Sequence, residues 1–470
     1  MKILGHGWVE DNIGNLPISL IDSDRSKRYP KRTEFKKDGI AFLNAESISG
    51  GYFDISKVNY ISLEKYEEIT KGRLQQNDLI LTMRGNGVGN TALFTSKIPF
   101  GLINAQMLIL RPKEGEIHSK FLYYLFINPQ FQKLLANFVT GSAQPQLTMT
   151  HLRHVPTTLP PLPEQKAIAH ILGTLDDRIE LNRRMNETLE GMAQALFKSW
   201  FVDFDPVLDN ALASGKEIPP ELREKAEARR ELRDLEAPLH PLPKEIRTLF
   251  PDEFTFTDEL GWIPKGWEVK PMNMIVKSVS ETYPLKSIDK VVFLNTGDIQ
   301  DGQFLHNDFS ETATLPGQAK KSIKKDDILY SEIRPKNRRF AYISFDAPTH
   351  VVSTKLMVLR SISDIKSIFA YFILKQKSTI DYLQMMAESR SGTFPQITFD
   401  VLSTINTALP KKSAIINYFT ENIIELSLEK SIANTNNSKN LAKLRDTLLP
   451  KLLSGEIRIP DAEKLVEAVG

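Results

Sequence analysis

The chain repeats itself once, and this repeat limits its possible architecture more than any other feature. IAFLNAESISGGYF at 40–53 aligns without a gap with VVFLNTGDIQDGQF at 291–304, an offset of 251 residues. Downstream, QNDLIL matches KDDILY, MLILRP matches LMVLRS, and PQLT matches PQIT, in the same order and at offsets between 249 and 251. Solenoid repeats have periods of about 20–50 residues, so a period this long indicates a duplicated domain.

Each copy is followed by a long helical segment. PLPEQKAIAHILGTLDDRIELNRRMNETLEGMAQALFKSWF at 161–201 contains no proline after Pro163, and a second such segment follows Pro410. The first segment carries apolar residues and one asparagine at heptad spacing, namely Ile168, Leu172, Leu175, Ile179, Asn182, Met185, Leu189, Met192 and Leu196. The second carries Ile416, Phe419, Ile423 and Leu426, followed by Leu441, Leu444 and Leu448. One such helix per repeat predicts an antiparallel coiled coil, in which a single core asparagine sets the register. The alternative is that each helix packs only on its own domain.

Within each copy, short β-rich runs are separated by Gly, Asn and Asp turns, and a helical pattern follows at 120–139. Runs of strands followed by helices indicate the α+β class. We predict two α/β domains from the duplication at 1–160 and 260–408, long helices at 161–204 and 409–456, and a tail at 457–470. A charged and proline-rich linker at 205–259 is expected to run back along the first long helix, with disorder as the alternative.

Composition limits the cellular compartment in which the protein is expected. The 470 residues include no cysteine, which excludes disulfides and thiolate chemistry. No apolar run reaches the roughly 18 residues of a membrane span, and the first residues lack the features of a signal peptide. We therefore expect a cytoplasmic protein without a membrane partner.

Catalytic motifs are poorly matched. RGNGVGNTALF at 84–94 has a GxGxG pattern, but its glycines lead into a strand-like run, whereas a cofactor loop opens a helix. NPQF at 128–131 resembles an amino-methyltransferase motif but lies in a helical pattern and lacks the second proline. Near Asp327 and Glu332, Arg334 stands where a metal-dependent nuclease needs lysine. His151 and His154 show no metal-site spacing. We predict a chain that is not an enzyme and has no metal site, and single-chain methyltransferase is the disfavoured alternative.

The net charge of +2 conceals two basic segments. The segment at 25–37 has seven basic residues and one acidic residue, and the segment at 320–339 has eight basic and three acidic residues. Two separate basic segments suit two phosphate-contacting surfaces. The alternative for each is a solvated run of surface charge.

Several of these segments together resemble one protein family. LPPLPEQKAIAHIL at 159–172, LFKSWFVDF at 196–204, GWIPKGWEV at 261–269, GSAQPQLT at 141–148 and LLPKLLSGEIRI at 448–459 are similar to landmarks of type I restriction–modification specificity (S) subunits. The resemblance covers nearly the whole chain. One departure is that Lys411 and Lys412 replace the Glu-Gln pair in the second helical block.

The resemblance implies a non-catalytic DNA specificity subunit. Its two target recognition domains would each read one half of a bipartite site in double-stranded DNA. Its central helices would set the gap and dock two methyltransferase (modification) subunits and the restriction subunits, which are motor nucleases. S-adenosylmethionine, ATP and Mg would then be bound by partner subunits only. The alternative is a coiled-coil adaptor without sequence-specific DNA binding.

Specific reading of DNA requires Arg or Lys on guanine and Asn or Gln on adenine, from loops that enter a groove. In the first domain the candidates are Arg84, Asn86, Gln106, Gln144 and Gln146. In the second they are Arg334, Lys336, Arg338, Arg339, Lys355 and Arg390. Lys355 aligns with Gln106 at an offset of 249 residues, which favours this pair. For each candidate, contact with a phosphate is expected at least as strongly as contact with a base.

Overall fold

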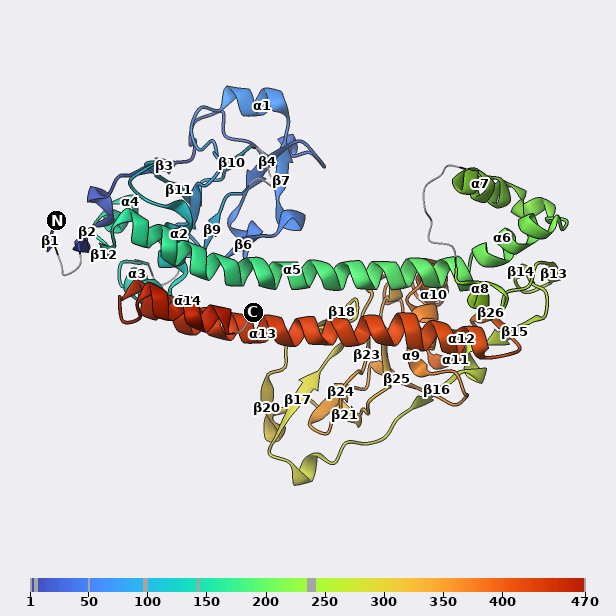
Figure 1. Ribbon diagram of the computed structural model, residues 1–470. Coiled ribbons are helices and arrows are strands. Elements are labelled where there is room, and N and C mark those ends of the chain that lie inside the picture. The colour runs from blue at the N-terminus through green and yellow to red at the C-terminus, as the bar shows by residue number, and fades with distance from the viewer. Residues whose placement is uncertain are drawn as a thin grey trace. The chain divides into compact units, whose positions relative to one another are not determined.

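The computed structural model describes residues 2–3, 7–49, 51–95, 100–141, 144–234 and 242–468. The chain forms two compact units. Unit 1 comprises Met1–Arg184 and Asn434–Gly470, and unit 2 comprises Met185–Ala433. Each unit thus contains one copy of the repeat together with a part of each long helix (Figure 1).

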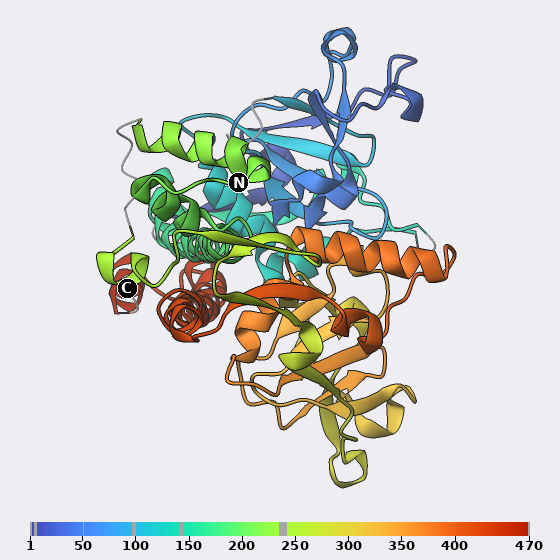
Figure 2. The same ribbon diagram turned by 90° about the vertical axis from the view of Figure 1, so that its right-hand side faces the viewer.

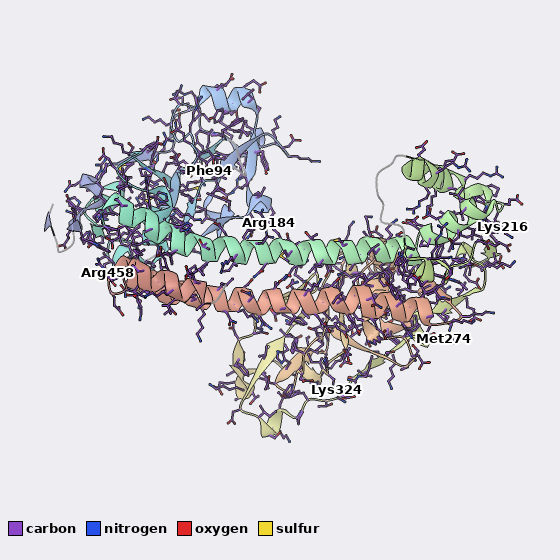
Figure 3. All side chains as sticks on the ribbon, in the orientation of Figure 1. Phe94, Arg184, Lys216, Met274, Lys324 and Arg458 are labelled. Atoms are coloured by element: carbon purple, nitrogen blue, oxygen red, sulfur yellow. The ribbon has the colours of Figure 1, made fainter. Side chains whose placement is uncertain are left out.

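In its described residues, unit 1 contains three small sheets and a hairpin. The strand orders are β3-β11-β8-β9, β10-β4-β7 and β1-β2-β12, and β5 pairs with β6. Phe94 (labelled in Figure 3) is fully buried in the core formed by β4, β8 and β11. The strands are β1 (Lys2–Ile3), β2 (Val9–Asn12), β3 (Ile18–Asp22), β4 (Ile40–Leu43), β5 (Ile48–Ser49), β6 (Tyr52–Phe53), β7 (Asn59–Ile61), β8 (Leu79–Thr82), β9 (Thr91–Leu93), β10 (Gly101–Ile103), β11 (Met107–Pro112) and β12 (Pro156–Leu159). The helices are α1 (Leu63–Glu68), α2 (Ser119–Ile127), α3 (Pro129–Ala136), α4 (Met149–Arg153), the first part of α5 (Leu162–Phe201), the last part of α13 (Leu426–Leu453) and α14 (Ile459–Glu467).

Unit 2 repeats this topology. The order β16-β25-β22-β23 corresponds to β3-β11-β8-β9, and the parallel pair β17/β24 corresponds to β4/β10. Its strands are β13 (Phe254–Thr257), β14 (Gly261–Pro264), β15 (Trp267–Pro271), β16 (Val276–Val279), β17 (Lys290–Leu294), β18 (Ile299–Gln300), β19 (Gln303–Phe304), β20 (Phe309–Glu311), β21 (Ala319–Ser322), β22 (Ile328–Ser331), β23 (Phe340–Tyr342), β24 (His350–Ser353), β25 (Leu356–Ser361) and β26 (Asn406–Pro410). Its helices are the rest of α5, α6 (Asp205–Ser214), α7 (Arg223–Asp234), α8 (Lys244–Arg247), α9 (Ser367–Leu374), α10 (Lys377–Arg390), α11 (Phe399–Ser403), α12 (Ala414–Phe419) and the first part of α13.

The strand register is also repeated. Ile109 lies opposite Ile80 in unit 1, and Val358 lies opposite Leu329 in unit 2, each pair related by an offset of 249 residues. The predicted α+β fold from an internal duplication is therefore confirmed at the level of individual strand pairs.

The long helices pair antiparallel in both units. In unit 1, Arg445 Nη1 donates to Asp176 Oδ1 at 2.7 Å, and Asn182 Nδ2 donates to Ser438 Oγ at 3.2 Å. In unit 2, Asn186 Nδ2 donates to the backbone oxygen of Ser431 at 3.3 Å. The partner's number falls as the number along α5 rises, and the two helices lie side by side in Figures 1 and 2. The 40 residues of α5 extend for about 60 Å.

The buried face of α5 corrects part of the predicted seam. Ile168, Leu172 and Leu175 are fully buried as predicted, but Met185 and Met192 are 44% and 59% exposed. The buried face continues from Asn182 by steps of four and three residues and reaches Ala193, which is buried. Met185 and Met192 each precede this face by one residue, which rotates them by about 100°.

A π-helix corrects the seam of the second long helix. Residues Thr420–Glu425 form this π-helix between α12 and α13. Its wider turn shifts the phase of the helix, so Ile424 is buried while Leu426 is 45% exposed, contrary to the prediction. Further along, Leu441 and Leu448 are buried as predicted.

The corrected face of α5 can be tested with two adjacent residues. We expect Met192→Gln to change the free energy of unfolding by less than about 0.5 kcal/mol, because the side chain is exposed and both residues favour helices. Ala193→Gln should destabilise by about 1–3 kcal/mol, because it forces a larger polar group into the core beside Phe197. Urea denaturation of both variants measures the difference, and equal effects would contradict this face.

The linker folds onto the C-terminal end of α5, so the expectation that it runs back along that helix is wrong. Val207, Ile246 and Phe250 are buried in one core with Trp200 and Phe201, the aromatic residues that end α5. Arg229 of α7 forms ion pairs with two aspartates of α6, Asp205 and Asp209. The aromatic end of α5 offers more apolar surface than its charged outer face, which explains where the linker packs. The linker residues 235–241 lie outside the described part of the chain.

Among the residues that the structure describes, no helix has both the length and the apolar character needed to cross a bilayer.

Candidate nucleic-acid interface

Backbone hydrogen bonds in unit 1 bring together three segments that are far apart in the sequence. At the end of β8, Met83 N donates to Gln106 O at 2.7 Å, and Leu147 N donates to Met83 O at 2.9 Å. Gly85 N donates to Pro145 O at 3.0 Å. We call residues 83–86, 104–106 and 144–147 the unit 1 cluster. It contains all five candidate residues of the first domain.

Unit 2 has the same arrangement. At the end of β22, Glu332 N donates to Lys355 O at 3.0 Å, and Ile397 N donates to Glu332 O at 2.9 Å. Arg334 N donates to Pro395 O at 3.1 Å. We call residues 332–335, 353–355 and 394–397 the unit 2 cluster. The bonded positions are related to those of unit 1 by 249 or 250 residues.

In the unit 1 cluster the polar side chains are amides and one guanidinium. Asn104 Nδ2 donates to Gln106 Oε1 at 3.1 Å, and Asn104 Oδ1 accepts from the backbone N–H of Gln106 at 3.0 Å. Gln144 and Asn86 are exposed, whereas Arg84, Gln106 and Gln146 are partly exposed. The Tyr29 hydroxyl accepts from Ala105 N at 3.2 Å, which ties the basic segment 25–37 to the cluster. The exposed lysines and arginines of that segment therefore lie in the same unit, on a segment bonded to the candidate base-reading residues.

The unit 2 cluster replaces amides by charges. Lys355 Nζ donates to Glu332 Oε2 at 3.4 Å and to Gln396 Oε1 at 3.3 Å. Lys321, from the basic segment 320–339, donates through Nζ to Leu356 O at 2.8 Å beside Lys355. Burial lowers the pKa of Lys321 below its ordinary value. Lys324 of the same segment is exposed (Figure 3).

The remaining candidates of unit 2 lie on the connection from β22 to β23 and at the end of α10. Arg334 and Arg338 flank a short 3-10 turn with left-handed φ values of 44° and 55°. Lys336 is exposed, and its backbone N–H donates to Gln384 Oε1 at 3.0 Å. Arg338 pairs with Asp301 at 2.8 Å, which reduces its availability for phosphate.

Two candidates differ in their relation to the unit 2 cluster. Arg339, partly exposed, contacts the strand end through its backbone oxygen, which accepts from Ser331 N at 2.9 Å. Arg390, exposed at the end of α10, donates to Thr398 Oγ1 at 3.3 Å, next to the third segment. The structure therefore brings Arg334, Lys355 and Arg390 to one place, whereas Lys336, Arg338 and Arg339 continue along the adjoining loop.

Sequence reasoning missed four side chains of these clusters. Asn104, Glu332 and Gln396 hydrogen-bond to the two favoured candidates, and Phe394 is 56% exposed in the segment that matches Gln144. The repeat alignment held a signal for two of them, because Phe394 and Gln396 align with the candidates Gln144 and Gln146.

The architecture and sequence are similar to those of known proteins. Residues 18–191 and 264–440 match the family model described as type I restriction modification DNA specificity domain. The type I restriction enzyme HindI specificity subunit of Haemophilus influenzae is 27% identical, over 96% of this chain and 99% of its own length. The MjaIX specificity subunit of Methanocaldococcus jannaschii is 25% identical, over 87% of this chain and 86% of its own.

A solved structure has the same fold. The S subunit of a type I restriction–modification system from M. genitalium superposes with a TM-score of 0.52 at 16% identity, covering 96% of this chain and 98% of its own. Together, the family model covers most of the chain and matches both copies of the repeat. The chain therefore belongs to the specificity subunits of type I restriction–modification systems, and each copy of its repeat is a DNA specificity domain of that family.

Proposed function

We propose that this chain is a non-catalytic subunit that reads a bipartite site in double-stranded DNA, with one half-site read by each cluster. The observation that carries the proposal is that both units hold three segments in the same backbone frame but present different side chains there. Gln106 in unit 1 corresponds to Lys355 in unit 2, and Met83 corresponds to Glu332. A constant frame with variable polar side chains is what separate reading of two sequences requires.

The basic segments supply the second part of the proposed interface. Segment 25–37 is bonded to the unit 1 cluster through Tyr29. Segment 320–339 includes Arg334 of the unit 2 cluster, and its Lys321 donates to Leu356 O beside that cluster. Contacts from Lys and Arg to phosphate position a protein on the duplex without reading bases. In this arrangement the clusters read base edges and the basic segments hold the backbone.

The long helices are proposed to set the gap between half-sites and to dock two modification subunits and the restriction subunits. Support comes from the antiparallel contacts between α5 and α13 within each unit. Methyl transfer and cleavage would take place on the partner subunits, which would bind S-adenosylmethionine, ATP and Mg. A cytoplasmic location, where the partners would also be present, stays a prediction.

Exchange of one domain tests the proposal. Residues 267–410 include both β15 and β26, which pair from Trp267 opposite Pro410 to Pro271 opposite Asn406, so their replacement by the matching segment of a relative keeps this strand pair whole. We expect the complex with modification subunits to methylate a site in which only one half-site has changed. Sequencing that detects methylated adenine measures the result, with unexchanged chain as the control. A change in both half-sites, or methylation without sequence preference as expected of a mere adaptor, would overturn the proposal.

A further inference from the structure

We infer that the unit 2 cluster reads a G·C base pair with Lys355 and Glu332, at the position where the unit 1 cluster reads an A·T pair with Gln106. This inference rests on the proposed function, and it names the base chemistry of the two half-sites.

Gln106 and Lys355 leave the backbone at equivalent places. Each accepts, through its backbone oxygen, from the residue that directly follows the central strand, which is Met83 in unit 1 and Glu332 in unit 2. The backbone N–H of each residue also donates to the side chain two residues earlier in the chain. Gln106 N donates to the Asn104 side chain at 3.0 Å, and Lys355 N donates to Ser353 Oγ at 3.3 Å. The side chains therefore start from the same position in the frame.

Lys355 presents only donors. Among the described residues its ammonium group has two acceptors, Glu332 and Gln396, so one of its three N–H groups remains available. The side chain is 45% exposed. In the major groove guanine offers two adjacent acceptors, N7 and O6, whereas adenine places an amino donor beside N7. A donor-only group is therefore complementary to guanine.

Glu332 adds the matching acceptor. Its Oε2 accepts from Lys355, and its other carboxylate oxygen can accept from the N4 amino group of the cytosine paired with that guanine. The ion pair is 3.4 Å long, with the two side chains 45% and 23% exposed, so it is held weakly enough to adjust to a base pair. The equivalent position of unit 1 holds Met83, which is buried and carries no such acceptor.

Gln106 has both the hydrogen-bond donor and the acceptor that adenine requires. Its Oε1 accepts from Asn104 Nδ2 at 3.1 Å and keeps a second lone pair. Within the described part of the chain, its NH2 group has no protein acceptor. One amide can thus donate to adenine N7 and accept from adenine N6, which an ammonium group cannot do.

The test replaces the two proposed reading residues of the unit 2 cluster with their counterparts in unit 1. The full chain, in complex with its modification subunits, is prepared as wild type and as the double variant Lys355→Gln, Glu332→Met. Domain exchange first assigns a half-site to unit 2, and binding is then measured on duplexes that carry each base-pair substitution in that half-site. We expect one position to change its preference from G·C to A·T, with relative affinities altered about 5- to 150-fold. All other positions should keep their preferences.

Two further variants keep the result interpretable. Lys355→Arg retains a donor-only group and should keep the G·C preference, which provides a second reading if the double variant fails to fold. Lys320→Gln removes an exposed basic residue and should weaken binding to all sequences equally. The inference is overturned if a folded Lys355→Gln, Glu332→Met chain reads every position as wild type does, or if Lys355→Arg loses the G·C preference. Absence of any sequence preference in the wild-type complex would instead refute the proposed function.

Discussion

Asp78→Ala is expected to lower the free energy of unfolding of unit 1 by about 3–5 kcal/mol, because it removes one partner of a buried ion pair. The Asp78 side chain is 1% exposed, and it accepts from Arg111 Nε at 2.7 Å and Nη2 at 2.8 Å. Without the carboxylate, Arg111 would keep, among the residues that the structure describes, only a backbone acceptor, the oxygen of Arg73. The guanidinium charge would then be partly buried without a counterion.

The equivalent ion pair of unit 2 should lose less free energy of unfolding when its aspartate is removed. Asp327 is fully buried and accepts from Arg360 Nε at 2.7 Å and Nη2 at 2.9 Å. Hydrogen bonding to Asp327 raises the pKa of Arg360 above its ordinary value. Arg360 has a second carboxylate partner, Glu281, at 2.6 Å. Asp327→Ala should therefore cost about 3 kcal/mol, the lower end of the range.

Urea denaturation, with hydrogen exchange followed separately in β8 and β22, measures these losses unit by unit. Asp381→Ala is the control, because Asp381 and its partner Lys377 are 48% and 88% exposed. We expect this control to change stability by less than about 0.5 kcal/mol. If Asp78→Ala were no more destabilising than the control, the repeated ion pair would not hold the sheets together.

Matched insertions in the two long helices should lengthen the gap between the two proposed half-sites, whose bases are not read. Both half-site sequences should stay unchanged. The unit boundary falls after Arg184 in α5 and after Ala433 in α13 (Arg184 is labelled in Figure 3). Four residues added at both places leave the contacts within each unit intact, including Asn182 to Ser438 and Asn186 to Ser431.

The expected change in the gap follows from helix geometry. Four residues add about 6 Å and rotate the helix by about 40° beyond a full turn. One base pair of DNA rises about 3.4 Å and rotates about 35°. The translation corresponds to about two base pairs and the rotation to about one, so we expect the gap to grow by one or two base pairs.

Mapping of methylated adenines by the complex measures this gap. The comparison is an insertion in α5 alone, which leaves α13 without matching residues and should bulge or reduce activity. An active complex with the matched insertions that keeps the original gap would show that the helices do not set the spacing.

Features that repeat along the chain, or that depend on neighbouring residues, could be predicted from the order of residues. The offset of 249–251 residues predicted two domains of one topology, and the strand pairs of both units agree with it. Apolar spacing predicted two long helices, because residues three and four apart lie on one face of a helix. One such helix per repeat predicted that the two pair antiparallel. The alignment of Gln106 with Lys355 also placed two candidate residues at equivalent positions. These features are local or copied, so the order of residues is sufficient to find them.

Contacts between distant segments could not be predicted in this way, because they depend on how the folded chain packs. Heptad spacing placed Met192 in the seam after Leu189, but packing of the aromatic core buries Ala193 and leaves Met192 exposed. Glu332 and Gln396 reach Lys355 across 23 and 41 residues because strand register and a returning loop bring them together. Such contacts depend on how whole strands and loops pack, and no spacing within a short window encodes them. The physical reason is that backbone geometry sets local periodicity, whereas burial of apolar surface and pairing of strands set long-range contacts.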